Sequence, residues 1–167
     1  SFVLTVAGFT CIAFSRFGVT FWTPAFFMRF HDMSVGEVAT LVGTVSVFAG
    51  IAGDVVGGVW ADHWKETNKG GRLLVGVFAA GVPIPLIVWM LYTDQTYVAA
   101  ALLAPIMLCG AMFTGPGAST VQDLVLPRMR GTGAAVLILS LNLIGLGIGP
   151  YLVGRISDSV GDLRMGM

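Results

Sequence analysis

Long apolar runs dominate the chain, and short polar segments separate them. Each run reaches the roughly 20 residues with which a helix crosses a bilayer, and none shows the alternating polarity of a strand in a membrane barrel. The pattern therefore predicts an all-α, polytopic membrane helix bundle with five spans. Their expected bounds are about 2–30, 35–62, 73–93, 96–126 and 131–156.

Charged residues are rare. Hydrophobic residues make up 56% of the chain and charged residues 11%, with a mean hydropathy of +0.87, whereas soluble domains carry roughly one-quarter charged residues. We expect membrane lipid, and no nucleic acid, around this chain. Cys11 and Cys109 fall inside predicted spans without CxxC or Cys/His spacing, so we expect both to be packing residues.

Basic residues gather in alternate loops. The second and fourth loops carry five of them, namely Lys65, Lys69, Arg72, Arg128 and Arg130. The first loop holds only Arg29, the third holds none, and Arg155 and Arg164 in the tail do not reverse this excess. Because cytoplasmic loops are rich in Lys and Arg, we expect the second and fourth loops to be cytoplasmic. We expect a multi-pass protein of a bacterial inner (plasma) membrane.

A short pattern occurs twice along the chain. GDVVGGVWAD and GPYLVGRISD share G-x-x-x-x-G-x-x-x-D at a constant offset of 96 residues, and they close the second and fifth predicted spans. Three spans separate equivalent points, so the two copies lie on opposite faces of the membrane. Such inverted three-helix repeats are typical of secondary transporters.

Small residues recur every four positions in the same two spans. Gly53, Gly57 and Ala61 form one such series, and Gly145 and Gly149 form the other. Small residues at this spacing let the backbones of two membrane helices approach closely. We expect both series to lie at helix contacts.

GGVWADHWKETNKGGR resembles the loop signature of the major facilitator superfamily, G-x-L-x-D-R-x-G-R-[KR]-x-[KR]. Gly58 and Asp62 take the places of its Gly and Asp, and Lys69 and Arg72 supply its late basic charge. The chain departs from the signature where Trp60 replaces the usual Leu, where a His replaces the first Arg, and where extra residues follow the aspartate.

Other stretches resemble the carboxy-terminal half of spinster-like members of that superfamily, whose relatives move lysolipids and other amphiphilic anions. These stretches are FWTPAFFMRFHDMSVGEVA, LPRMRGTGAA and GPYLVGRISD. The resemblance covers nearly the whole chain and implies helices seven to eleven of twelve. Residues 1–167 are then expected to form a partial carboxy-terminal transmembrane domain, a half-fold of inverted three-helix repeats that lacks its last helix. The amino-terminal half of the same carrier would be its partner.

The repeated pattern suggests a set of gating residues. Asp62 can be stabilised by the positive end of a neighbouring helix and by nearby cations in one state and released in another. Asp123 is expected near the cytoplasmic basic residues, although exposed ion pairs contribute little. The full set expected to act in gating is Gly58, Asp62, Lys69, Arg72, Asp123, Arg130, Gly149, Pro150, Gly154 and Asp158.

Two charges lie deep inside predicted spans. Asp54 is about 12 Å deeper than Asp62 at roughly 1.5 Å per helical residue, and we expect it to be a buried charge. Arg16 is the only charged residue between positions 2 and 28. Ionisable groups at such depth indicate function. Three roles stay open for Arg16: it pairs with Asp54, it binds an anionic substrate in a central cavity, or it reaches the interface or a partner in the other half of the carrier.

Further polar side chains could join Arg16 in binding a solute, although most intramembrane hydroxyls bond their own helix. The expected set for substrate binding is Arg16, Thr20, Trp22, Thr23, Ser119 and Asn142. Together with the resemblance, it indicates a secondary active transporter that moves a small amphiphilic or anionic solute, lipid-like or an organic anion, by alternating access. A channel or a helical scaffold remains an alternative.

We expect no enzyme, cofactor or metal. The two histidines, His31 and His63, fall at opposite membrane faces, and the sequence has no HExxH pattern. The sequence is also expected to be a fragment that does not transport by itself.

Overall fold

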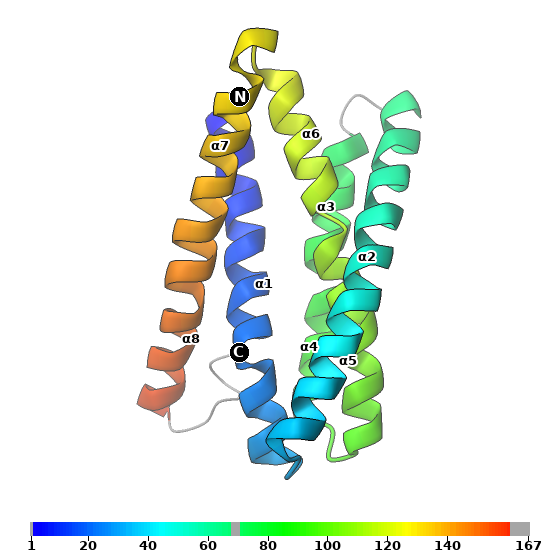
Figure 1. Ribbon diagram of the computed structural model, residues 1–167, viewed down its shortest axis with the longest axis vertical. Coiled ribbons are helices and arrows are strands. Elements are labelled where there is room, and N and C mark those ends of the chain that lie inside the picture. The colour runs from blue at the N-terminus through cyan, green and yellow to red at the C-terminus, as the bar shows by residue number, and fades with distance from the viewer. Residues whose placement is uncertain (1, 68–70, 161–167) are drawn as a thin grey trace. The chain divides into compact units, whose positions relative to one another are not determined.

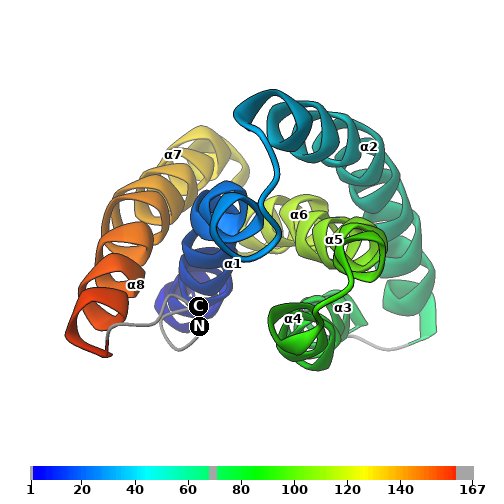
Figure 2. The same ribbon diagram turned by 90° about the horizontal axis from the view of Figure 1, so that it is seen from below.

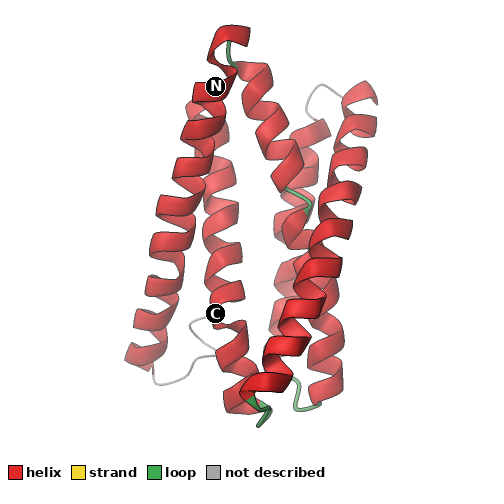
Figure 3. Ribbon diagram, in the orientation of Figure 1, coloured by secondary structure: helices red, strands yellow, loops and turns green. Residues whose placement is uncertain are grey.

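The computed structural model describes residues 2–67 and 71–160, apart from the side chains of 65–67, 72, 73 and 160. Every regular element in these residues is a helix (Figure 3). Five segments among them are long and apolar enough to cross a membrane: Phe2–Phe30, Val35–Trp64, Leu74–Tyr92, Thr96–Leu124 and Pro127–Ser159. The predicted all-α class is confirmed.

The first two spans are single helices, α1 (Phe2–Phe30) and α2 (Val35–Thr67). At the end of α1, the carbonyl of Phe27 accepts hydrogen bonds from the N–H groups of His31 (3.2 Å) and Met33 (3.4 Å). Asp32 between them has φ 50°, a left-handed conformation that Asp tolerates better than most residues. The chain therefore turns within four residues into α2.

The other three spans contain interruptions. Their elements are α3 (Gly71–Gly81), α4 (Pro83–Tyr92), α5 (Thr96–Ala111), α6 (Thr114–Leu124), the 3₁₀ turn η1 (Pro127–Met129), α7 (Arg130–Ser140), the π-helical η2 (Leu141–Leu146) and α8 (Gly147–Val160). Each break ends one to four residues before a proline, at Pro83, Pro116 and Pro150. A proline lacks the N–H that the carbonyl four residues earlier needs.

The chain forms two compact units, residues 1–23 with 117–167 and residues 24–116. In the second unit, α2 packs along α5 and α3, and α4 packs on α5 (Figures 1 and 2). Its largest fully buried side chains are Phe26, Phe27, Val75, Met90, Leu103 and Met112. In the first unit, α8 lies beside the middle of α1, where Gly149 and Gly154 approach Phe14 and Trp22 (Figure 1).

Candidate functional site

Glycines bring α1 and the last span into backbone contact. A Cβ added to Gly149 would lie 2.8 Å from the carbonyl oxygen of Phe14, and one added to Gly18 would lie 3.1 Å from Cγ2 of Val153. One turn earlier, a Cβ on Gly145 would lie 3.1 Å from the Cβ of Ala13 and 3.1 Å from Cδ2 of Phe17. The prediction that Gly145 and Gly149 lie at a helix contact is confirmed.

Trp22 bonds to the same span. Its indole N–H donates a 2.9 Å hydrogen bond to the backbone carbonyl of Pro150. A Cβ added to Gly154 would lie only 2.9 Å from Cζ2 of the Trp22 ring. Trp22 was expected among the substrate-binding residues, but its polar atom is engaged with α8. Three residues of the expected substrate and gating sets, Trp22, Pro150 and Gly154, are thus brought together.

Arg16 lies on a different face of α1. It is the central residue of the 29-residue helix, its side chain is half-buried, and its Nε atom is buried. Its guanidinium carbon lies 5.5 Å from the centroid of the Phe17 ring, within the range of a cation–π contact. At 3.6 residues per turn, Thr20 and Thr23 follow Arg16 on one side of α1, away from the line of Phe14, Gly18 and Trp22.

The threonines on this face differ in what their hydroxyls do. Thr23 is fully buried, and its hydroxyl donates a 2.9 Å hydrogen bond to the carbonyl of Val19. Such a hydroxyl is already satisfied within its own helix. Thr20 is half-buried. Of the two, Thr20 is the better placed to contact a solute.

Helix α6 contributes Ser119, and η2 contributes Asn142. Ser119 is half-buried and follows Gly117, where an added Cβ would lie 3.1 Å from the ring of Phe9 in α1. Phe9 precedes Arg16 by about two turns on the same side of α1. Asn142 is exposed, and its amide donates a 2.8 Å hydrogen bond to the carbonyl of Ile138, which engages its own helix.

In the unit of residues 24–116, small residues of α2 meet α5 and the turn after it. A Cβ added to Gly53 would collide with the carbonyl of Leu108, and one added to Gly57 would collide with the backbone of Met112. Ala61, one turn further, is only 1% exposed. This confirms the prediction for the first series of small residues.

Asp54 requires a correction. It was expected to be a buried charge, yet the structure places it on an exposed face of α2. The reason is its register, because Gly53 and Gly57 occupy the face against α5 and Asp54 follows Gly53 by about 100°. Exposed apolar side chains share the surface of α2 with Asp54, among them Val47, Phe48, Ile51 and Val55.

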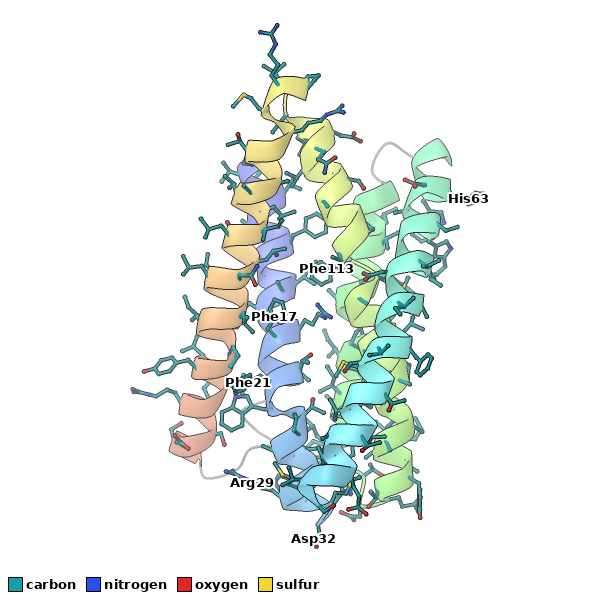
Figure 4. All side chains as sticks on the ribbon, viewed as in Figure 1. Phe17, Phe21, Arg29, Asp32, His63 and Phe113 are labelled. Carbon is teal, nitrogen blue, oxygen red and sulfur yellow. The ribbon has the colours of Figure 1, made fainter. Side chains whose placement is uncertain are left out.

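The expected gating residues lie mostly at helix ends. Asp62 is exposed in the last turns of α2. Gly58 is half-buried, and within the described part of the chain no atom lies within 4 Å of a Cβ added to it. Figure 4 shows His63 at this end of α2 and Asp32 at the opposite end. Lys69 lies outside the described residues, as does the side chain of Arg72.

The remaining gating candidates belong to the other unit. Asp123 and Arg130 are exposed where α6 and α7 meet η1. Asp158 is exposed near the end of α8, three spans away from its counterpart Asp62. The structure thus places these charged groups at helix ends rather than in the middle of the spans.

The two copies of the repeated pattern make equivalent contacts. Gly53 in the second span contacts Leu108 in the fourth, and its counterpart Gly149 in the fifth span contacts Phe14 in the first. In a three-helix repeat, the first span corresponds to the fourth and the second to the fifth, so the two contacts are the same contact in two copies. Subtracting the repeat offset of 96 from the position of Leu108 gives position 12, which is two residues before Phe14.

Comparison with known proteins agrees with this arrangement. Residues 1–150 match the profile of the Major Facilitator Superfamily. The chain belongs to this superfamily. Proteins named spinster are among its relatives.

An MFS-type efflux pump of Mycolicibacterium smegmatis is 32% identical over 97% of this chain and 38% of that protein. Protein spinster of Drosophila melanogaster is 27% identical over 96% of this chain and 28% of that protein. The crystal structure of a bacterial homolog to the human lysosomal transporter spinster, in an inward-facing and occupied conformation, matches with a TM-score of 0.75 and 23% identity. It covers 95% of this chain and 34% of that chain, and it shows the shared fold. This chain therefore spans between 28% and 38% of the length of these relatives.

Several residues with specific contacts were missed from the sequence. Gly18 and Phe14 form half of the contact between α1 and α8, and His31 bonds to Thr96. The series Phe14, Gly18 and Trp22 has the four-residue spacing of a contact face. That spacing is the signal that could have found the first pair.

Proposed function

We propose that this chain is part of a secondary active transporter that moves a small amphiphilic or anionic solute by alternating access. Membership of a superfamily of membrane transporters supports the transport role. The similarity to an MFS-type efflux pump of Mycolicibacterium smegmatis supports a solute carrier rather than a channel or a scaffold.

Arg16 carries the proposal for the solute. A guanidinium at the centre of a membrane-spanning helix is expensive unless it serves a function. Its planar donors fit a carboxylate or phosphate in a bidentate way. The contact between α1 and α8 uses a different face of α1 from the one that carries Arg16 and Thr20. In this proposal Arg16 holds the anionic group, and Thr20 and Ser119 add hydrogen bonds.

The proposed gate consists mainly of charged residues at the helix ends. Asp62, with Lys69 and Arg72 after it in sequence, would close the cytoplasmic side in one state and release it in the other. Asp123 and Arg130 would take part on the same side. The second copy, Gly149, Pro150, Gly154 and Asp158, would act at the opposite side.

The exposed face of α2 indicates that other helices of the same carrier lie next to it. A carboxylate near the middle of a span is costly against lipid, and Asp54 is exposed among apolar side chains in α2. We therefore propose that other helices of the carrier cover this face or border it with a water-filled cavity. The carrier would then work in a bacterial inner membrane as a larger helix bundle, and residues 1–167 alone would not transport.

Flux through the full-length carrier in proteoliposomes tests this function. The probes are dodecyl phosphate and dodecyl trimethylammonium, which share an alkyl chain and differ in charge. We expect saturable uptake of the phosphate, stimulated by the same solute on the opposite side, and little uptake of the cation. Uptake that never saturates and shows no such stimulation would instead indicate a channel.

Substitutions at Arg16 test the binding role. Arg16→Lys keeps the charge but loses the bidentate geometry, and it should reduce transport at least roughly tenfold, as loss of a charged hydrogen bond of about 1.5–3 kcal/mol implies. Arg155→Ala is the matched control, because Arg155 is exposed and its guanidinium donates a hydrogen bond to the hydroxyl of Tyr151 in its own helix. Full-rate transport by a well-expressed Arg16→Ala carrier would rule out this role.

A further inference from the structure

Span five has a weak point just before its contact with Trp22. The N–H of Gly147 bonds to the carbonyl of Asn142, five residues back, as in a π-helix. Pro150 follows, and it removes the donor that the carbonyl of Leu146 would have had in an α-helix. Single π-helical turns and prolines are where membrane helices bend. The segment from Leu141 to Leu146 is therefore the place where this span can change direction.

Trp22 acts on the residues directly after this weak point. Its N–H holds the Pro150 carbonyl at 2.9 Å, and its ring fills the space beside Gly154, four residues later. Gly149, directly before Pro150, lies against the Phe14 carbonyl. The first turns of α8 are thus held to α1 by one hydrogen bond and by two glycine contacts.

The ring of Trp22 contacts only one of the two copies of the repeated pattern. Gly154 in the second copy contacts the ring of Trp22, whereas no atom of the described residues lies within 4 Å of a Cβ added to its counterpart Gly58 in the first copy. The residue that corresponds to Trp22 in the fourth span, at the offset of 96, is Ala118. The repeat therefore supplies the glycine in both copies but the indole in one, which indicates a role specific to the pair of α1 and α8.

We propose that Trp22 is a positioning residue that fastens the Pro150–Gly154 segment to α1, so that the two move as one body and span five bends at Leu141–Leu146. The proposal rests on the transport function proposed above, since it describes motion in the transport cycle. Because Arg16 and Trp22 share α1, the contact also sets the direction in which Arg16 faces relative to α8.

Spin-label distances in the full-length carrier test the contact itself. One label pair at Ser15 and Leu152, both exposed, reports the distance between α1 and α8, and a pair at Leu139 and Leu152 spans the π-helical segment. In nanodiscs without solute, the first pair should give one narrow distance in the wild type. Trp22→Phe keeps an aromatic ring but removes the N–H donor, and it should broaden that distance.

Two further variants separate this contact from a general loss of stability. Gly154→Ala should broaden the same distance, because its Cβ would lie 2.9 Å from the Trp22 ring. Combining Trp22→Phe with Gly154→Ala should broaden the Ser15–Leu152 distance by less than the sum of the two single effects, as expected for groups in one contact. Trp89→Phe is the matched control, because Trp89 in α4 is 60% exposed and should leave both distances unchanged.

Transport kinetics with dodecyl phosphate give the second readout. Loss of one hydrogen bond should lower kcat roughly two- to tenfold in Trp22→Phe and leave KM within about twofold. Adding dodecyl phosphate to the wild type should change the Leu139–Leu152 distance and leave the Ser15–Leu152 distance unchanged.

Three results would overturn the proposal. They are an unchanged Ser15–Leu152 distance in both Trp22→Phe and Gly154→Ala, a raised KM with unchanged kcat, and a Ser15–Leu152 distance that shifts with solute in the wild type. If dodecyl phosphate is not transported at all, the proposed solute class fails. The distances without solute still decide whether Trp22 holds α8.

Discussion

Nδ1 of His31 and the hydroxyl oxygen of Thr96 are hydrogen-bonded at 3.2 Å, across 65 residues of sequence. His31 directly follows α1, and Thr96 is the first residue of α5. The rings of Phe26 and Phe27 lie 5.3 Å and 5.5 Å from the imidazole. The bond therefore joins the turn after the first span to the start of the fourth, within the unit of residues 24–116.

Replacing Thr96 by Val should destabilise this unit. The substitution keeps the shape of the side chain but removes the hydroxyl, which should cost about 1 kcal/mol. Thermal unfolding of the detergent-solubilised carrier measures the effect, and Thr96→Ser, which keeps a hydroxyl, should behave like the wild type. Equal melting temperatures for Val and Ser at this position would show that the bond contributes nothing.

The amino terminus of α2 offers a second test. Ser34 and Glu37 form a capping box, in which the Ser34 N–H and hydroxyl donate to Oε2 of Glu37 at 2.9 and 2.7 Å and the Glu37 N–H donates to Oγ of Ser34 at 3.4 Å. Ser34→Ala should lower stability by about 1 kcal/mol, whereas Ser34→Asp keeps a capping oxygen. Chemical denaturation in mild detergent measures the free energy of unfolding of the wild type, Ser34→Ala and Ser34→Asp. A Ser34→Ala variant as stable as the wild type would contradict the cap.

Glycines of α2 allow a matched comparison of two positions. An alanine at Gly57 would collide with the backbone of Met112, whereas the Cβ of one at Gly50 would have no atom of the residues described here within 4 Å. Gly57→Ala should therefore destabilise by about 1–3 kcal/mol, as overpacking does, and Gly50→Ala should be neutral or slightly stabilising. Similar melting temperatures for the two variants would mean that α2 does not approach α5 as closely as described.

The proposed cytoplasmic gate predicts a shift between states. Asp62→Asn removes the charge from the end of α2 and should favour the inward-open state. The measurement is cross-linking between a cysteine at His63 and a cysteine on the cytoplasmic side of the other half of the full-length carrier, where the yield should fall. Asp94→Asn, in an exposed loop at the other end of the helices, serves as the control. Unchanged cross-linking in Asp62→Asn would argue against the gate.

Orientation in the membrane can be tested by labelling. In a background with Cys11 and Cys109 replaced by Ala, cysteines are introduced at His63 and Gln95, which are both exposed. An impermeant reagent should reach position 95 in intact cells and position 63 only after permeabilisation. The opposite result would invert the topology that the basic loops predict.

Local sequence determined the spans, because the energy of a helix in a bilayer depends on its own apolar length. The runs without charge predicted the third, fourth and fifth spans, and the spacing of Gly53, Gly57 and Ala61 predicted a close helix contact. The offset between Gly53 and Gly149 predicted equivalent positions, which the structure shows in equivalent contacts. All of these features are periodic or repeated in sequence.

Only the tertiary structure decided which partner each face meets. The sequence could not show that Trp22 donates to Pro150, 128 residues away, because an indole N–H in a span can bond any carbonyl that packing brings to it. It could not place Asp54 on an exposed face, since its depth follows from counting residues but its direction depends on which side of α2 meets α5. The sequence also could not predict the π-helical turn before Pro150. A proline removes one hydrogen-bond donor from a helix, but the neighbouring groups decide how the freed carbonyl is satisfied.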